Sequence, residues 1–495
     1  MRPLVARPRS GGWAVRWLLV RGLGLVYLVA FLSLAVQVLP LLGAAGLTPA
    51  ADYLDGLRDR DGITLDLPTI FWFWASDGAL QGLAWVGVGL SVAVVLGVTN
   101  AFVQMALWLL YLSFAHVGQV WYGYGWEILL LEAGFLSIWL CPWRSIDAFD
   151  PRAPPPLPIL LLYRWLVFRL MLGAGLIKLR GDGCWRDLTC LDFHFETQPI
   201  PNPLSWWFHH LPPSIHAFMV GWNHVVELIV PWLCFGPRWA RRIAAVVIVQ
   251  FQLTLILTGN LSFFNHLTIV LCVALLDDEL LVRLLGVRVR VRSLAASAVA
   301  VSSRARAVFI GAVAVFLALL GVRPALNLLS PGQRMNGSFD AWHLVNTYGA
   351  FGSVGRERYE VIVEGTRDGV EWRAYEFPCK PGDPGRRPCV ISPFQPRLDW
   401  QIWFAAQQEP SENLWLVHLL YGLMRGTPEV TALLAGNPFP DGPPVIVRAE
   451  LYQYRYTAFG EPGWWARERV GTYIRPLTID DPTMQALVEQ EGWAR

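Results

Sequence analysis

The segment that decides the fold is Tyr163–Pro213, YRWLVFRLMLGAGLIKLRGDGCWRDLTCLDFHFETQPIPNPLSWWFHHLPP. It begins inside a long apolar run and ends in a loop rich in charged, histidine and aromatic residues. A helix needs about 20 apolar residues to cross the hydrocarbon layer of a bilayer, and the run Leu157–Leu179 is long enough. The segment therefore predicts a membrane-spanning helix followed by a polar loop on one side of the membrane.

The composition of the 495 residues supports a membrane protein. Hydrophobic residues make up 54% of the chain and charged residues 16%, and the mean hydropathy is +0.39, whereas soluble domains are about a quarter charged. These values argue against a soluble globule, a disordered chain and a fibrous repeat. The net charge of +2 gives no reason to expect a nucleic-acid partner.

Apolar runs follow one another up to about Arg323, and nine of them are candidate spans. We therefore expect a polytopic α-helical membrane protein with about nine transmembrane helices. The membrane domain is predicted over residues 1–329, with an outer loop at 181–213, and a soluble domain over residues 330–495. The predicted spans are Trp13–Leu39, Ala79–Val98, Ala101–Trp121, Trp126–Cys141, Leu157–Leu179, Ser214–Phe235, Ile243–Leu257, Leu261–Leu276 and Ala307–Val322.

The distribution of arginine predicts which way the chain faces, because basic loops stay on the cytoplasmic side. Arginines crowd the N-terminal segment and the predicted loops 142–156, 236–242 and 277–306, whereas loop 41–78 holds six Asp and two Arg. The N-terminus is therefore predicted to be cytoplasmic. Since nine spans is an odd number, the C-terminal domain is predicted to lie outside, in the periplasm or an organelle lumen.

Four of the seven cysteines form two close pairs on this predicted outer side. The pairs are Cys184 with Cys190, and Cys379 with Cys389. Disulfides persist in oxidising compartments, so both pairs are candidate bridges. The alternative is that all four are free thiols.

The C-terminal domain is predicted to be small and mainly β, with one or two helices. Two alternating runs flank Arg367-Asp368-Gly369, a pattern typical of a hairpin. No nucleotide-binding or hydrolase motif occurs in the domain, which favours binding over catalysis. The expected strands are Tyr359–Gly365, Glu371–Phe377 and Pro444–Thr457, and the expected helices are Leu414–Met424 and Pro428–Ala435.

Several ionisable residues lie within predicted spans, where such residues are costly unless they are paired or face water. Arg169 is the deepest of them and needs a partner, for which Glu132 and Glu227 are the candidates. Lys178 lies near the outer end of its helix and can extend its ammonium group to the interface.

His224 and Glu227 are three residues apart and share one helix face. A metal site needs three or four converging ligands, which one His-x-x-Glu pair does not supply. Hydrogen-bonded polar residues inside the bundle are therefore expected, with no metal and no cofactor.

Two long motifs resemble the lipase maturation factor family. They are GAGLIKLRGDGCWRDLTCLDFHFETQPIPNPLSWWFHHLP (Gly173–Pro212) and YEVIVEGTRDGVEWRAYEFPCKPGDPGRRPCVISPFQPRLDWQIWFAA (Tyr359–Ala406). The resemblance implies a membrane-anchored factor that helps exported, lipase-like client enzymes to fold and assemble. It implies membrane lipid and the client as partners, and the endoplasmic reticulum membrane in a eukaryote or the inner membrane in a bacterium as the location.

The same two motifs supply the candidate client-binding residues, because exposed aromatic side chains suit the recognition of incompletely folded protein. An alternative is that the tryptophans belong to an interfacial aromatic belt. The candidates are Trp206, Trp207, Phe208 and His209 in the outer loop and Arg397, Asp399 and Trp400 in the C-terminal domain.

Two other functions remain open. GAGLIKL followed by Trp185 is similar to a transmembrane motif of vitamin K-dependent γ-carboxylase, in which a lysine acts as base, and Lys178 is the matching position. A small-molecule transporter is the other alternative, because Arg169, Glu132 and Glu227 lie within predicted spans.

Overall fold

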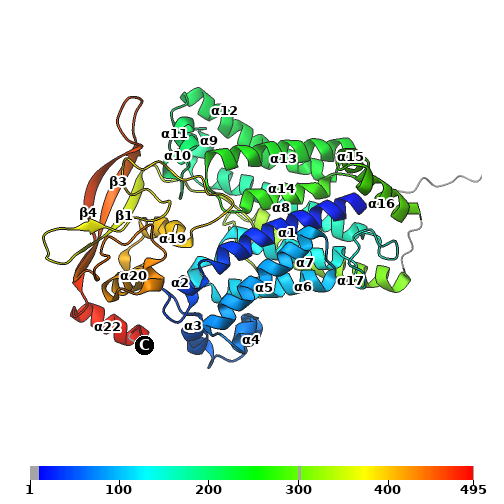
Figure 1. The fold of residues 1–495 in the computed structure, drawn as a ribbon. Helices are drawn as coiled ribbons and strands as arrows, with labels where there is room; N and C mark the ends of the chain where they lie inside the picture. Colours follow the sequence, from blue (N-terminus) through cyan, green and yellow to red (C-terminus); the bar gives the residue numbers. More distant parts are fainter. Residues whose placement is uncertain (1–10, 299–302, 494–495) are drawn as a thin grey trace, which may run out of the picture.

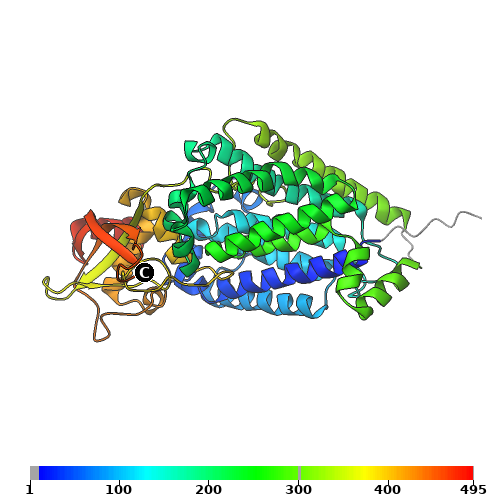
Figure 2. The same ribbon diagram turned by 90° about the horizontal axis from the view of Figure 1, so that it is seen from above.

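The computed structural model describes residues 11–298 and 303–493 of the chain, which form a bundle of helices with a small sheet domain at one end (Figure 1). The bundle helices run roughly along a common axis (Figure 2). Arg2, Arg7 and Arg9, which contributed to the predicted orientation, lie outside the described residues.

All nine predicted spans are helical within the described residues. Among the residues that the structure describes, six helical segments are long and apolar enough to cross a membrane, so the chain is an integral membrane protein. The other three are shorter, and the count of nine stays a prediction. The six are α1 (Trp13–Ala35), α5 (Asp77–Leu96), α8 (Leu157–Arg180), Pro213–Phe235, α13 (Arg238–Thr258) and Arg304–Leu329. The three are α6 (Ala101–Val117), α7 (Gly125–Leu140) and Phe264–Leu275.

Three of these segments change their helical form along their length. Pro213–Phe235 consists of α12 (Pro213–His224), a π-helical turn η3 (Val225–Ile229) and a 3₁₀ segment η4 (Val230–Phe235). Pro231 lies just after the π turn and has no backbone N–H to donate, which explains why regular α-helix does not continue. The others are α14 (Phe264–Leu271) with η5 (Cys272–Leu275), and α17 (Arg304–Leu320) with α18 (Val322–Leu329).

The loops predicted to be cytoplasmic meet at the end of the bundle away from the sheet domain, beside α15 (Asp278–Leu284) and α16 (Val287–Ala298) (Figure 1). There Asp278 accepts hydrogen bonds from the first N–H groups of α1, Arg292 pairs with Asp147 at 2.5 Å, and Arg242 pairs with Asp277 at 2.8 Å. The distribution of loops is thus the one expected from the arginine pattern. The compartment that each end faces stays a prediction.

The loops predicted to be outside contact the sheet domain. His418 bonds to the carbonyl of Leu47 at 2.8 Å, and the indole of Trp403 donates to the carbonyl of Thr197 at 3.0 Å. Short helices build these loops: α2 (Val38–Leu42), α3 (Ala50–Leu57), α4 (Ile63–Asp66), η1 (Ile70–Trp72), η2 (Gln119–Trp121), α9 (Gly183–Arg186), α10 (Leu191–Thr197) and α11 (Pro203–His209).

The sheet domain contains four antiparallel strands in the order β2-β1-β3-β4. Val361 of β1 lies opposite Leu451 of β3, and Gly365 opposite Val447. The β-rich fold class is therefore confirmed. The strands are β1 (Arg358–Thr366), β2 (Arg373–Ala374), β3 (Ile446–Tyr456) and β4 (Trp465–Thr478), and the helices are α19 (Arg397–Ala405), η6 (Pro410–Glu412), α20 (Leu414–Arg425), α21 (Pro428–Thr431) and α22 (Pro482–Glu491).

Some details of this domain differ from the expectation. The strand expected at Glu371–Phe377 is reduced to the two residues of β2, because only Glu364 and Gly365 of β1 pair with it. The helix expected at Pro428–Ala435 ends at Thr431. Strand β4 and helices α19 and α22 were not predicted at all. In β4 the residues Arg467–Val470 are all exposed and three of them are charged, so the strand lacks the apolar alternation that reveals a half-buried strand.

Residues 343–352 return from α18 to the bundle without forming a helix or strand. The amide of Asn346 donates to Glu132 on α7 at 2.9 Å, and the carbonyl of Gly352 accepts from Asp182 at 3.0 Å. A methyl group on Gly173 of α8 would lie 2.5 Å from the carbonyl oxygen of Tyr348, so glycine there permits this close approach. The segment joins the membrane helices to the sheet domain.

Candidate functional site

The most unusual polar group of the bundle is centred on Lys178, near the end of α8. Its ammonium lies 2.6 and 2.7 Å from the two carboxylate oxygens of Glu227 and 3.3 Å from Oδ1 of Asn223. Asn223 in turn donates to Glu227 at 2.9 Å. Lys178 and Glu227 are almost fully buried, so the lysine turns into the bundle instead of reaching the interface.

Glu227 lies on the π-helical turn η3. Such turns are rare and frequently mark functional sites, because the extra residue redirects a side chain. Gly175 of α8 lies directly opposite, and a methyl group there would be 2.9 Å from Cβ of Glu227. Glycine at this position lets α8 and η3 approach closely enough for Lys178 and Glu227 to pair.

The Lys178–Glu227 pair forms part of the wall of a cavity of about 730 Å³. The cavity lies between α8, α12, α13 and α14 on one side and residues of the 335–353 segment and α19 on the other. Its walls are mainly apolar and aromatic, with a few polar groups, which is the usual character of a small-molecule site. The lining includes Lys178, Asn223, Glu227, Gln252, Asn265, Met171, Phe251, Trp185, Phe351 and Trp403.

The outer loop closes one end of this cavity. The disulfide between Cys184 and Cys190 is present, which confirms this predicted bridge. It holds Trp185, whose indole donates to the carbonyl of Phe351 at 2.8 Å and whose own carbonyl bonds to His224 at 3.0 Å. His224 therefore holds the loop against α12.

His194 on α10 also lines the cavity, and its ring packs on Phe351 at 4.8 Å between centroids. Burial, together with the positive charge of Lys178, lowers the pKa of His194 to about 4. The imidazole is therefore neutral at physiological pH. Among the described residues no group of three His, Cys, Asp or Glu side chains converges as metal ligands.

A second buried pair joins Arg169 to Glu132, the first of the two partners that the sequence left open. Glu132 also accepts hydrogen bonds from the hydroxyl of Tyr348 at 2.8 Å and from the amide of Asn346, and Arg169 donates to the carbonyl of Asn346 at 2.5 Å. These contacts hold the 343–352 segment to α7 and α8, and neither Arg169 nor Glu132 lines the cavity.

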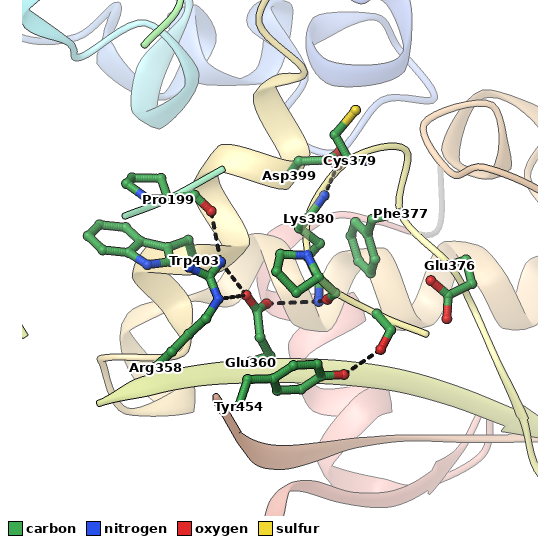
Figure 3. Close-up of polar contacts among 12 residues, drawn as sticks. Pro199, Arg358, Glu360, Glu376, Phe377, Cys379, Lys380, Asp399, Trp403 and Tyr454 are labelled. Atoms are coloured by element: carbon green, nitrogen blue, oxygen red, sulfur yellow. Dashed lines mark hydrogen bonds and ion pairs between the residues drawn. The ribbon is translucent and has the colours of Figure 1, made fainter. Parts of the chain in front are cut away.

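Two charged clusters fasten the sheet domain to the bundle. Figure 3 shows the first, in which Arg358 and Lys380 both pair with the buried Glu360, at 2.5 and 2.9 Å. Arg358 also donates to the carbonyl of Pro199 in the outer loop at 2.9 Å. The sheet is thereby bound to the loop that closes the cavity.

The second cluster contains three of the candidate client-binding residues, and all three are buried. Arg397 pairs with Glu127 of α7 at 2.5 Å. Asp399 accepts from the backbone N–H groups of Cys379 and Lys380 at 2.5 and 2.8 Å, and Trp400 packs on Trp126. The disulfide between Cys379 and Cys389 is also present, as predicted. In this conformation these residues hold the interface together, and contact with a client stays a prediction.

The candidates on α11 meet the turn between β3 and β4. We call Trp206, Trp207, His210, Phe459 and Trp464 the aromatic patch. Trp206 donates to the carbonyl of Thr457 at 3.0 Å and its ring lies 4.9 Å from that of Phe459. Trp207 and Phe459 are 55% and 63% exposed.

The other two candidates on α11 are less accessible. Phe208 packs beneath the patch on Phe195, with the ring centroids 5.6 Å apart. His209 lies 3.7 Å from Glu196, and burial lowers its pKa to about 4. Of the four residues, Trp207 is therefore the one most available to a partner.

The fold and these sites define an integral membrane protein whose outer loop and sheet domain are tied together over a cavity. Residues 14–283 match the lipase maturation factor transmembrane domain, and residues 344–475 match the lipase maturation factor C-terminal domain. The chain belongs to the lipase maturation factor family.

Relatives match along almost the whole chain. It is 43% identical to lipase maturation factor 1 of Bos taurus, over 96% of this chain and 91% of that protein, and 43% identical to the Homo sapiens protein of that name, over 97% and 90%. Lipase maturation factor 2 of Gallus gallus is 32% identical over 96% and 83%. No solved structure matches the chain.

Proposed function

We propose that the chain is a membrane-anchored maturation factor that binds lipase-like exported enzymes and helps them reach their active, assembled state. The observation that carries this proposal is the 43% identity to a lipase maturation factor over 96% of the chain, which includes both the membrane part and the sheet domain. The proposal of a maturation role therefore rests on similarity in the sheet domain as well as in the membrane helices.

We propose that the client binds at the aromatic patch. Trp207 and Phe459 present large apolar surfaces to solvent, and their ring centroids lie 5.9 Å apart, so the two exposed surfaces are adjacent. Exposed apolar patches on a folded protein mark interaction sites, and tryptophan is enriched among the residues that dominate binding energy. Incompletely folded enzymes expose complementary apolar segments.

Two features favour a lumenal or periplasmic location for this surface. Both disulfides lie in the outer loop and the sheet domain, and such bonds form in oxidising compartments. The arginine-rich loops lie at the other end of the bundle, as the positive-inside rule requires for a cytoplasmic end. In a eukaryotic host this compartment is the endoplasmic reticulum, and in a bacterium it is the periplasm.

The test is deletion of the gene in its host, followed by measurement of secreted lipase activity per unit of lipase protein. We expect the specific activity to fall severalfold while synthesis of the lipase is unchanged, and the wild-type gene to restore it. Unchanged specific activity of every secreted lipase would contradict the proposal.

A membrane-embedded enzyme that uses Lys178 as base is a second candidate, favoured by the position of Lys178 in the cavity wall. Its ammonium is held by Glu227 and Asn223, and an ammonium in that state has no free lone pair with which to accept a proton. Under this candidate Lys178→Arg would abolish activity although charge and pairing are kept. Under the maturation proposal Lys178→Arg is tolerated.

A further inference from the structure

The cavity reaches the lipid-facing surface of the bundle between α12 and α13. Phe218 on α12, which is 69% exposed, and Gln250 on α13, which is also exposed, are both part of its lining. Gln250 accepts a hydrogen bond from the indole of Trp222 at 3.2 Å and donates to Thr254 at 3.1 Å. A molecule dissolved in the bilayer therefore has a route into the cavity beside these residues.

Asn265 is one of the residues of the cavity wall whose buried side chain has a polar atom without a hydrogen-bond partner among the described residues; the others are Trp126, His194 and Trp400. Asn265 on α14 is 1% exposed, and its amide nitrogen donates to Gln252 at 2.7 Å. Its Oδ1 has no hydrogen-bond partner within the described ranges 11–298 and 303–493. A buried polar atom without a partner costs about 1–3 kcal/mol, so a ligand group that bonds to Asn265 gains that free energy. A ligand hydroxyl can bond to the side-chain amide of Asn265 whether the oxygen or the NH₂ group faces the cavity, because a hydroxyl both donates and accepts hydrogen bonds.

The charges of the wall indicate the kind of head group. Lys178 and Glu227 compensate each other within hydrogen-bond distance, and the buried His194 is neutral. A charged head group would bring an uncompensated charge into a cavity whose wall is already balanced, and an isolated buried charge is strongly unfavourable. An uncharged, hydroxyl-bearing head group carries no such cost.

We propose that this cavity binds a single-chain neutral lipid whose apolar chain lies among the aromatic and aliphatic residues and whose hydroxyl head bonds to Asn265. The volume of about 730 Å³ lies within the range of pockets that enclose one small ligand. The bilayer is the source of the ligand, and the passage beside Phe218 and Gln250 is its route. This binding does not depend on the maturation role, and each can fail without the other.

The test titrates the full-length protein in detergent with 1-oleoylglycerol, methyl oleate and oleate and measures bound lipid by native mass spectrometry. The three probes share one acyl chain and differ in their head groups. We expect 1-oleoylglycerol to bind about tenfold more tightly than either of the others, the ratio that one hydrogen bond to a buried group supports. Equal binding of the three probes, or tighter binding of oleate, would overturn the proposal.

Variants locate the site. Asn265→Leu should remove the preference for 1-oleoylglycerol over methyl oleate, whereas Gln81→Leu, at an amide on α5 outside the cavity lining, should keep it. Ala174→Phe, which places a ring in the cavity, should abolish binding of every probe. Undiminished binding to Ala174→Phe would place the lipid elsewhere and refute the proposal, even if Asn265→Leu fails to fold.

Discussion

Two buried pairs of opposite charge lie within the described part of the bundle, and their surroundings differ. Around Arg169 and Glu132 the protein supplies further partners, from the hydroxyl of Tyr348 and the backbone of Asn346. Lys178 of α8 pairs with Glu227 on a π-helical turn, and both residues line a cavity. We call a region closed where protein groups surround its side chains on every side, and open where its side chains also face a cavity or the solvent.

This difference between closed and open regions separates residues that stabilise the fold from residues that can contact a ligand or a client. In a closed region every partner is protein, so removing a charge leaves another charge buried and unpaired. In an open region the polar groups also face space that a ligand or a client can occupy. The cluster at Arg358 and Glu360 is closed in the same sense, whereas the aromatic patch is open. We therefore expect substitutions to reduce stability in closed regions and function in open ones.

The largest effect is expected from Arg169→Met. Glu132 would keep its hydrogen bonds but lose its positive partner inside a packed part of the bundle. Breaking a buried pair costs about 3–5 kcal/mol, so the yield of folded protein and its thermal stability in detergent should both fall strongly. The double variant Arg169→Met/Glu132→Leu, which removes both charges, should recover part of the loss. No recovery would show that the pairing itself is unimportant.

Lys178→Met should destabilise the chain less, by about 1–3 kcal/mol. Asn223 still donates to Glu227, and the adjacent cavity allows water to reach the carboxylate. The measurement is thermal unfolding of this variant beside Arg169→Met under the same conditions. Equal losses of stability would remove the distinction between closed and open pairs.

The sequence predicted the helices of the bundle well, because apolar runs of span length have few other stable forms. It identified Arg169, Glu132, Lys178 and Glu227 as costly residues in a membrane, but it left the partner of Arg169 open. Which residues meet depends on the rotation of each helix about its axis, and Glu227 lies 49 positions from Lys178 on a turn whose π form has no sequence signal.

The joining segment and the buried position of α19 were beyond sequence reasoning. Residues 343–352 have no periodic pattern. His343 and Phe351 both adopt a positive φ angle of 53°, and neither residue type indicates such a backbone conformation in a sequence. Arg397 and Asp399 carry charges, which predicts exposure, yet both are fully buried because Glu127 and two backbone N–H groups bond to them. Contacts between residues distant in sequence decide these placements.

Stability should depend on pH through Asp399 in the closed interface of the sheet domain. Burial raises the pKa of this carboxyl from 3.8 to about 6, against the opposing effect of the N–H groups of Cys379 and Lys380. The folded state therefore favours the protonated carboxyl of Asp399. The stabilisation that this protonated group provides is complete below about pH 4, and it is lost as the pH rises through about 6.

Asp399→Asn should lack this component, which a pKa raised from 3.8 to about 6 puts at about 3 kcal/mol. The measurement is the free energy of unfolding of wild type and variant at pH 4 and pH 7. The difference between the two proteins should change with pH, in the direction that favours wild type at the lower pH. A difference independent of pH would contradict a raised pKa.

Trp207→Ala should have the smallest effect on stability, within about 0.5 kcal/mol, because the side chain is 55% exposed. The specific activity of the secreted client should nevertheless fall severalfold. Trp239→Ala is the matched control, since Trp239 is 64% exposed but lies at the start of α13, near the opposite end of the bundle. Equal loss of client activity in both variants would point to a general role of exposed tryptophan at the membrane interface.

The most direct test of the central claim, that open regions carry function, is crosslinking from the aromatic patch. A photoreactive amino acid replaces Trp207 in one strain and Trp239 in another, and the proteins captured during lipase export are identified. We predict an adduct with newly exported lipase from position 207 and none from position 239. Lipase captured equally from both positions, or from neither while export proceeds, would contradict the account.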